Sequence, residues 1–159
     1  MKSIFDTVSF DCSKNVTKSY STSFSAAVKM LAPKIRQDIY NIYGFVRFAD
    51  EIVDTFHDHD KVALLTQFKK ETYDAIDRGI SLNPVLNSFQ LTVNEFNIDL
   101  KLVDAFFRSM EMDLEKKNYD CAGYKEYIYG SAEVVGLMCL YVFCEGKQEL
   151  FDHLEAPAR

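Results

Sequence analysis

Residues 33–54 constrain the fold more strongly than any other part of the sequence. Their apolar side chains recur every three or four residues, the spacing that covers one face of an α-helix. Pro33 suits the first turn of such a helix, because the backbone N–H that proline lacks would have no partner there. The apolar positions are Ile35, Ile39, Ile42, Phe45, Val46, Phe48, Ala49, Ile52 and Val53. We therefore predict one long helix, most of whose surface is covered by other parts of the chain.

The rest of the chain shows the same helical periodicity. Only 6 glycines and 3 prolines occur among the 159 residues, which leaves few breaks for many short strands. Ser23 is expected to cap the second helix and Gly79 to end the fourth. Further helices are expected at residues 4–18, 23–31, 61–78, 84–96, 99–114, 124–144 and 148–154. The sequence therefore predicts an all-α fold in a single domain, residues 1–159.

The composition is that of a folded, acidic protein. Apolar residues make up 48% and aromatic residues 14%, which excludes a disordered chain. The formal net charge of −6 argues against nonspecific binding to the phosphate backbone of nucleic acids. A site that handles phosphate in this chain therefore needs a local cation, either an arginine or a metal ion.

The cysteines and the apolar runs bear on the location of the protein. Cys12, Cys121, Cys139 and Cys144 form no C-x-x-C pair, and we interpret them as reduced, mostly buried thiols. The longest apolar run, residues 134–144, is about half as long as a membrane span requires. We expect a soluble, cytoplasmic protein, with peripheral contact to a membrane surface left open.

Tyr43, Arg47, Asp50 and Asp54 share one face of the long helix, since they lie three or four residues apart. Two carboxylates one turn apart repel each other by a few tenths of a kcal/mol unless a cation joins them. Magnesium is commonly held by one or two carboxylates together with substrate phosphates. Arg47 is placed either to hold a carboxylate or to bind a phosphate through two N–H groups. A D-x-x-x-D pair is also common on solvated helix faces, so an ordinary surface is the alternative.

Two other segments carry unusual side chains. Residues 20–25 read Tyr-Ser-Thr-Ser-Phe-Ser, which on its own is a helix cap with spare hydroxyl groups. Between residues 127 and 137, the small side chains of Gly130, Ala132 and Gly136 let a neighbour approach the helix closely. That neighbour is either another helix, which is the more frequent case, or an elongated apolar ligand.

Taken together, these segments resemble the squalene/phytoene synthase family, and bacterial phytoene synthases most closely. They occur in the family's order and at similar separations, and they span nearly the whole chain. Three linked motifs in register are far more specific than a lone pair of aspartates. The motifs are Ser21-x-x-Phe24, Tyr43-x-x-x-Arg47-x-x-Asp50-Glu51-x-x-Asp54 and Tyr129-Gly130-Ser131-Ala132-x-x-Val135-Gly136.

The resemblance implies an isoprenoid-synthase-type helical bundle around a deep apolar cavity, and it assigns roles to residues. Family members join two prenyl diphosphates head to head through a cyclopropyl intermediate. Mg²⁺, with Mn²⁺ as the alternative ion, bridges aspartates and diphosphate, while aromatic faces stabilise the carbocation. The expected site residues are Asp50 and Asp54 for the metal; Ser21, Phe24, Arg47 and Tyr129 for the substrate; and Tyr43 and Tyr129 for catalysis.

The expected reaction condenses two molecules of geranylgeranyl diphosphate to phytoene, a step of carotenoid biosynthesis. The alternatives are a squalene or dehydrosqualene synthase that uses farnesyl diphosphate, and a noncatalytic helical domain for assembly or lipid binding. The family's second aspartate-rich motif does not occur in the sequence. We therefore expect an N-terminal portion of the bundle, inactive by itself, whose partner is a prenyl diphosphate and not a nucleic acid. The oligomeric state is not predicted.

Overall fold

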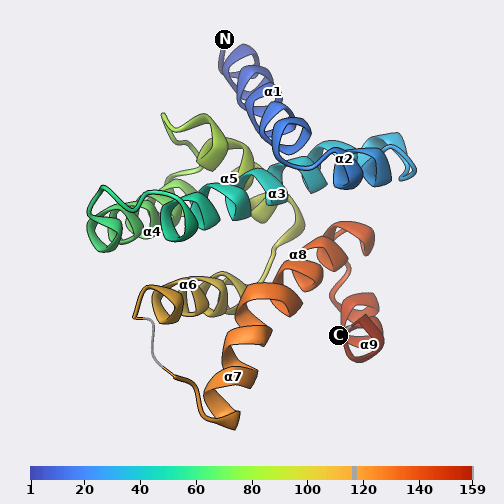
Figure 1. The fold of residues 1–159 in the computed structure, drawn as a ribbon. Coiled ribbons are helices and arrows are strands. Elements are labelled where there is room, and N and C mark those ends of the chain that lie inside the picture. Colours follow the sequence, from blue (N-terminus) through green and yellow to red (C-terminus); the bar gives the residue numbers. More distant parts are fainter. Residues whose placement is uncertain (116–117, 159) are drawn as a thin grey trace.

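Helix α3 (Pro33–Asp54) runs across the centre of the molecule, with helices on both sides of it (Figure 1). In this computed structural model, which describes residues 1–115 and 118–158, α1 and α5 pack on one side and α6 and α8 on the other. The described residues contain no strand, so the all-α prediction is confirmed. The remaining helices are α1 (Lys2–Tyr20), α2 (Thr22–Val28), α4 (Lys61–Arg78), α5 (Pro84–Phe96), α6 (Leu100–Glu115), α7 (Cys121–Ile128), α8 (Val134–Phe143) and α9 (Gln148–Ala158).

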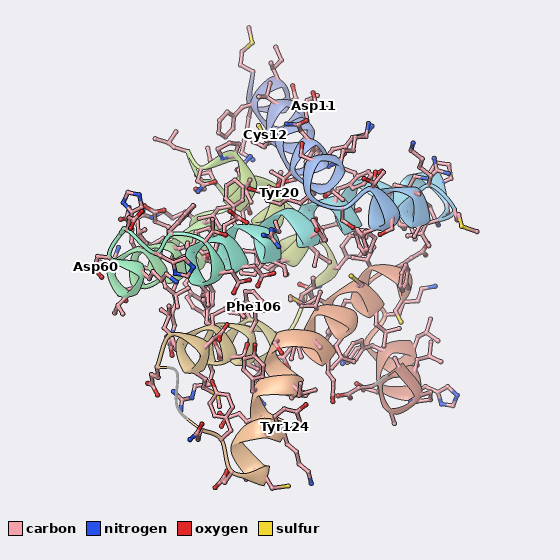
Figure 2. All side chains as sticks on the ribbon, viewed as in Figure 1. Asp11, Cys12, Tyr20, Asp60, Phe106 and Tyr124 are labelled. Atoms are coloured by element: carbon pink, nitrogen blue, oxygen red, sulfur yellow. The ribbon has the colours of Figure 1, made fainter. Side chains whose placement is uncertain are left out.

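A cluster of aromatic rings joins α3 to its neighbours. Phe45 stacks on Phe89 of α5 with 3.8 Å between the ring centroids, and Phe106 and Phe107 of α6 lie within 6 Å of the same ring. All four side chains are fully buried, and Phe106 marks the middle of the molecule in Figure 2. Burying a phenylalanine contributes about 1.5–3 kcal/mol, so this cluster is a main source of stability.

Helix α1 packs through hydroxyl groups instead of apolar side chains. Its buried residues are Ser9, Ser13 and Thr17, which lie four residues apart on one face. Ser13 Oγ is 2.5 Å from Ser88 Oγ of α5, and a Cβ at Gly44 of α3 would lie only 3.1 Å from Ser13 Oγ. Small side chains on both helices thus let α1 cross α3 at close range.

Most helix ends lie where the sequence predicts them. Asp60 caps α4 by accepting a hydrogen bond from the backbone N–H of Ala63, and Gly79 ends it with φ of +70°. The predicted cap of α2 was wrong, because Ser21 and not Ser23 accepts the bond from the N–H of Phe24. The chain is extended at Ser21, so the helix starts two residues earlier than expected.

The single helix predicted for residues 124–144 is interrupted. A π-helical segment, η1 (Tyr129–Glu133), separates α7 from α8. Within it, Gly130 lies so close to α6 that an added Cβ would be 2.3 Å from the carbonyl oxygen of Ala105. Periodicity does not reveal an extra residue in one turn, and such π-turns occur often at functional sites.

Helix α9 continues to Ala158, so Pro157 lies inside its last turn instead of opening a new helix. Since proline has no N–H, the backbone hydrogen bond from position 157 to the carbonyl four residues earlier is missing. Arg159 lies outside the described residues. In the part of the chain that the structure describes, no helix is long and apolar enough to cross a membrane.

Candidate functional site

Asp50 and Asp54 lie on the last turns of α3, as the helical spacing predicts. The pKa of Asp50 is raised from its ordinary value of 3.8 to about 6. Burial of the carboxyl group is the main cause, repulsion from Asp54 is the next, and Arg47 acts in the opposite direction. The two carboxylates are therefore close enough for their charges to oppose each other.

Two residues from other helices join this pair. Asp113 of α6 also raises the pKa of Asp50. The pKa of Tyr127 on α7 is raised first by burial, then by Asp113, and also by Asp54 and Asp50. Helices α3, α6 and α7 thus bring three carboxylates and one phenol together.

Neither Asp113 nor Tyr127 stands out in the sequence. Asp113 is one of several acidic residues on an amphipathic helix, which is typical of a solvated face. Tyr127 lies two residues before Tyr129, and in a helix those two side chains point to nearly opposite sides. Only the packing of α6 against α3 and of α7 against α6 brings Tyr127 near the aspartates.

An open pocket of about 730 Å³ lies beside the acidic cluster, next to the turn that joins α3 to α4. Lys61 donates a hydrogen bond from Nζ to the carbonyl oxygen of Val53, at 2.5 Å, and so ties the start of α4 to the end of α3. The pocket is lined by Val53, Asp54, His57, His59, Asp60, Lys61, Val62, Asp113 and Leu114. Carboxylates, imidazoles and an ammonium group therefore border one space that solvent can enter.

The carboxylates suit a hard divalent cation, although they do not form a complete site alone. Among the described residues, no three His, Cys, Asp or Glu side chains gather tightly enough to be a ready-made metal centre. Asp50 and Asp54 nevertheless offer oxygen donors whose mutual repulsion, seen in the raised pKa of Asp50, a cation would relieve. Mg²⁺ prefers this arrangement, in which water and substrate phosphates complete its octahedron.

Arg47 is paired, but not with the aspartates. Its Nη2 donates to Oε1 of Glu51, one turn later on α3, and its Cζ lies 4.6 Å from the centre of the Tyr20 ring. Figure 2 shows Tyr20 beside α3 at the end of α1. The Nε of Arg47 is buried and, in the described part of the chain, has no hydrogen-bond partner. An anion at Arg47 would satisfy this donor, whose burial otherwise costs about 1–3 kcal/mol.

Ser21, Phe24 and Tyr43 lie together where α2 meets α3. The rings of Phe24 and Tyr43 stack with their centroids 4.8 Å apart. Ser21 Oγ accepts the N–H of Phe24 at 3.2 Å, which leaves its own O–H available as a donor. The structure thus brings the first motif, Ser21-x-x-Phe24, into contact with Tyr43 of the second.

Tyr129 lies elsewhere on its helix. It lines a pocket of about 440 Å³ with Tyr124, Lys125, Ile128 and Glu133. The structure therefore places Tyr127 at the acidic cluster and Tyr129 at a different pocket. The catalytic and substrate roles predicted for Tyr129 stay predictions.

Comparison with known proteins adds independent information. Residues 17–159 match the family model described as squalene/phytoene synthase. The chain is 25% identical over 143 residues to a phytoene synthase from Arthrospira platensis, an alignment that covers 89% of the chain and 46% of the relative. It is 29% identical over 125 residues to a presqualene diphosphate synthase from Rhodopseudomonas palustris, covering 77% of the chain and 44% of the relative.

A crystal structure of a dehydrosqualene synthase in complex with ligand shares the fold. Its TM-score is 0.82 at 23% sequence identity, and the match covers 96% of the chain and 52% of that protein. The chain therefore shares the fold of about half of such a protein, and it spans about half the length of the relatives that it matches.

Proposed function

The chain belongs to the squalene/phytoene synthase family, and from this premise we propose that it supplies the first metal–diphosphate site of a head-to-head prenyl diphosphate synthase. The observation that carries the proposal is that Asp54 of α3 and Asp113 of α6 line one open pocket, with Asp50 one turn before Asp54 on α3. Asp54 and Asp113 both raise the pKa of Asp50, so negative charge from two helices is concentrated beside a pocket that solvent can enter. A site for a cation and a polyanion explains their arrangement.

Each residue has a defined task in this proposal. Asp50 and Asp54 would hold Mg²⁺, and the bound ion would offset the negative charge that develops on a departing diphosphate. Arg47 donates to a phosphate oxygen through its unpartnered Nε, while Glu51 keeps its side chain in place. The hydroxyl of Ser21 adds a further donor from the start of α2.

The apolar part of the substrate lies on the aromatic side of this site. The stacked pair of Phe24 and Tyr43 presents ring faces next to the helix that carries the aspartates. A desolvated carbocation beside such a face is stabilised by about 2 kcal/mol. Excluding water has the same importance, since water would capture the cation before a second prenyl chain could.

Geranylgeranyl diphosphate is the proposed substrate, and phytoene the proposed product. The phytoene synthase of Arthrospira platensis supports this choice. The presqualene diphosphate synthase of Rhodopseudomonas palustris and the dehydrosqualene synthase fold support the second candidate, a synthase that uses farnesyl diphosphate. Because residues 1–159 are expected to be inactive by themselves, the Mg²⁺-dependent affinity of the chain for each diphosphate, measured separately by calorimetry, distinguishes the two.

The metal assignment is tested by binding. We expect the purified chain to bind geranylgeranyl diphosphate more tightly with Mg²⁺ than with EDTA, as measured by isothermal titration calorimetry. Because both carboxylates would be lost as ligands, the double variant Asp50→Asn/Asp54→Asn should lower the Mg²⁺-dependent affinity at least tenfold.

The matched control removes one exposed carboxylate far from the site, on α4. Asp77→Asn should leave the Mg²⁺-dependent affinity unchanged, because Asp77 is exposed to solvent. The metal assignment fails if the double variant binds like the control. It also fails if Mg²⁺ has no effect on binding to the unmodified chain.

A further inference from the structure

A second pocket, of about 410 Å³, lies at the other end of α3, where α1 ends and the turn after α2 leads into α3. We name it the basic pocket, and its lining residues are Lys14, Lys18, Lys29, Pro33, Arg36, Gln37 and Tyr40. Arg36 precedes Asp50 by fourteen positions on α3, which is about 20 Å along a helix. The basic pocket is therefore separate from the acidic cluster.

The charge of this pocket is opposite to that of the whole chain. Four cationic side chains line it and no carboxylate does, although the chain has 24 acidic and 18 basic residues. In the described part of the chain, ion pairs within 4 Å engage other lysines, such as Lys2 with Asp6 and Lys70 with Asp74. None of these pairs involves a cation of the basic pocket.

The floor of the basic pocket is held rigidly. Arg36 donates from Nε to the carbonyl oxygen of Leu31 at 2.9 Å and from Nη2 to that of Lys29 at 2.7 Å. These bonds fix the guanidinium against the turn after α2 while other N–H groups of its five remain. Tyr40 is buried beneath it, and the Lys14 ammonium lies 6.0 Å from the centre of the Tyr40 ring.

Lysines provide the movable part of the site. Lys18 and Lys29 are exposed and come from different segments, the end of α1 and the end of α2. Flexible ammonium groups around a fixed guanidinium can close on an anion that enters between them. Four like charges without a counter-charge repel each other, and an anion with more than one negative charge relieves this repulsion.

We propose that the basic pocket binds a phosphate-bearing anion. A phosphate group matches the fixed guanidinium in geometry and the surrounding lysines in charge. Two sources carry this group, a free phosphate or diphosphate and the headgroup of an anionic phospholipid. Met30 follows Lys29 directly and is 88% exposed, so a headgroup in the pocket would place this apolar side chain against the lipid.

The two sources are tested separately, without divalent metal so that the acidic cluster does not contribute. Inorganic phosphate and diphosphate are titrated into the full chain at low salt and followed by calorimetry. Vesicles of phosphatidylcholine, with or without 30 mol% phosphatidic acid, are tested by co-sedimentation. The percentages of protein that sediment with the two kinds of vesicle are then compared.

The variant Lys18→Gln/Lys29→Gln removes two charges that are exposed and take part in no packing of the core. We expect it to bind the anion at least tenfold more weakly than the unmodified chain, because half of the cationic groups of the pocket are gone. The control Lys101→Gln/Lys147→Gln removes the same charge from other exposed positions and should bind as the unmodified chain does.

The outcomes differ for each source. Tight binding of diphosphate that the Lys18/Lys29 variant loses supports a site for a free anion. Sedimentation with phosphatidic acid vesicles alone, lost in the same variant, supports a headgroup site. If neither probe binds, or if both double variants weaken binding equally, general charge explains the result and the proposal is overturned. These measurements use no divalent metal and no prenyl chain, so their failure can be told apart from failure of the Mg²⁺-dependent test of the proposed function.

Discussion

Arg47 and Asp50 lie one turn apart on α3, yet their charges have different partners. Arg47 pairs with Glu51 and lies over the Tyr20 ring, while Asp50 faces Asp54 and Asp113. Burial of Asp50 and repulsion from Asp54 raise its pKa, and the opposing effect of Arg47 is too small to cancel them. At the scale of single residues, the site consists of an acidic cluster around Asp50 and of the Arg47 guanidinium, which Glu51 holds in place.

Tyr127 and Tyr129, two residues apart in the sequence, give a test at this scale. Tyr127→Phe removes the hydroxyl that lies near the carboxylates, so Mg²⁺-dependent binding of geranylgeranyl diphosphate should weaken. In the proposed complex the hydroxyl donates to the bound diphosphate, and a hydrogen bond to a charged group contributes about 1.5–3 kcal/mol, roughly a tenfold to hundredfold change in affinity. Tyr129→Phe is the matched change at the other pocket. If Tyr129→Phe weakens binding and Tyr127→Phe does not, then Tyr129 is the functional tyrosine, as the sequence motif predicts.

Asp38 predicts how stability depends on pH. Its pKa is raised from 3.8 to about 6, mainly by burial, while the hydrogen bond from Thr92 lowers it. The folded state therefore holds this proton more tightly than the unfolded state, so the stability that it contributes is present below about pH 4. This contribution is lost as the pH rises from about 4 to about 6. Because Asp38 is partly exposed, the loss is on the order of 1–2 kcal/mol.

The variant Asp38→Asn isolates this effect. Asparagine keeps an oxygen that accepts the hydrogen bond from Thr92 and removes the charge. Urea unfolding should show the variant to be more stable than the unmodified chain by about 1–2 kcal/mol at pH 7 and nearly equal to it at pH 4. A stability difference that is the same at both pH values would contradict the assignment.

Among the secondary-structure elements, the close crossing of η1 over α6 holds α7, and with it Tyr127, beside α6. Gly130 allows the crossing, because any Cβ there would meet the backbone of α6. The π-turn adds an extra residue to one turn, so side chains before and after it do not keep the register of a continuous α-helix. Tyr127 lies before this turn, on the same side of the bundle as Asp113.

Gly130→Ala tests the crossing. The new Cβ would lie 2.3 Å from the carbonyl oxygen of Ala105 and 2.8 Å from Ser109 Cβ, and backbone cannot move aside as a flexible side chain can. We expect a loss of stability of about 1–3 kcal/mol in urea unfolding. Gly136→Ala is the control, since nothing lies within 4 Å of its Cβ position. Alanine should there be neutral or stabilise the helix by about 0.5–1 kcal/mol, and equal losses in both variants would show that the crossing is not special.

At the scale of the whole molecule, α3 connects two regions of opposite charge. The acidic cluster lies at its C-terminal end and the basic pocket at its N-terminal end, with the aromatic core between them. Both regions require other helices, α6 and α7 at one end and α1 and α2 at the other. A single rigid helix can hold these regions apart because its central part is buried on most sides.

The sequence by itself determined the helical class, most helix ends, the long central helix and the face that carries Arg47, Asp50 and Asp54. These features are local, since helical spacing, capping residues and turn glycines act within a few positions of the chain. Only the tertiary structure decided that Glu51 holds Arg47, that Asp113 and Tyr127 join the aspartates, and that four cations meet in one pocket. These contacts join residues on different helices or choose between neighbours on one helix, and helix packing decides both.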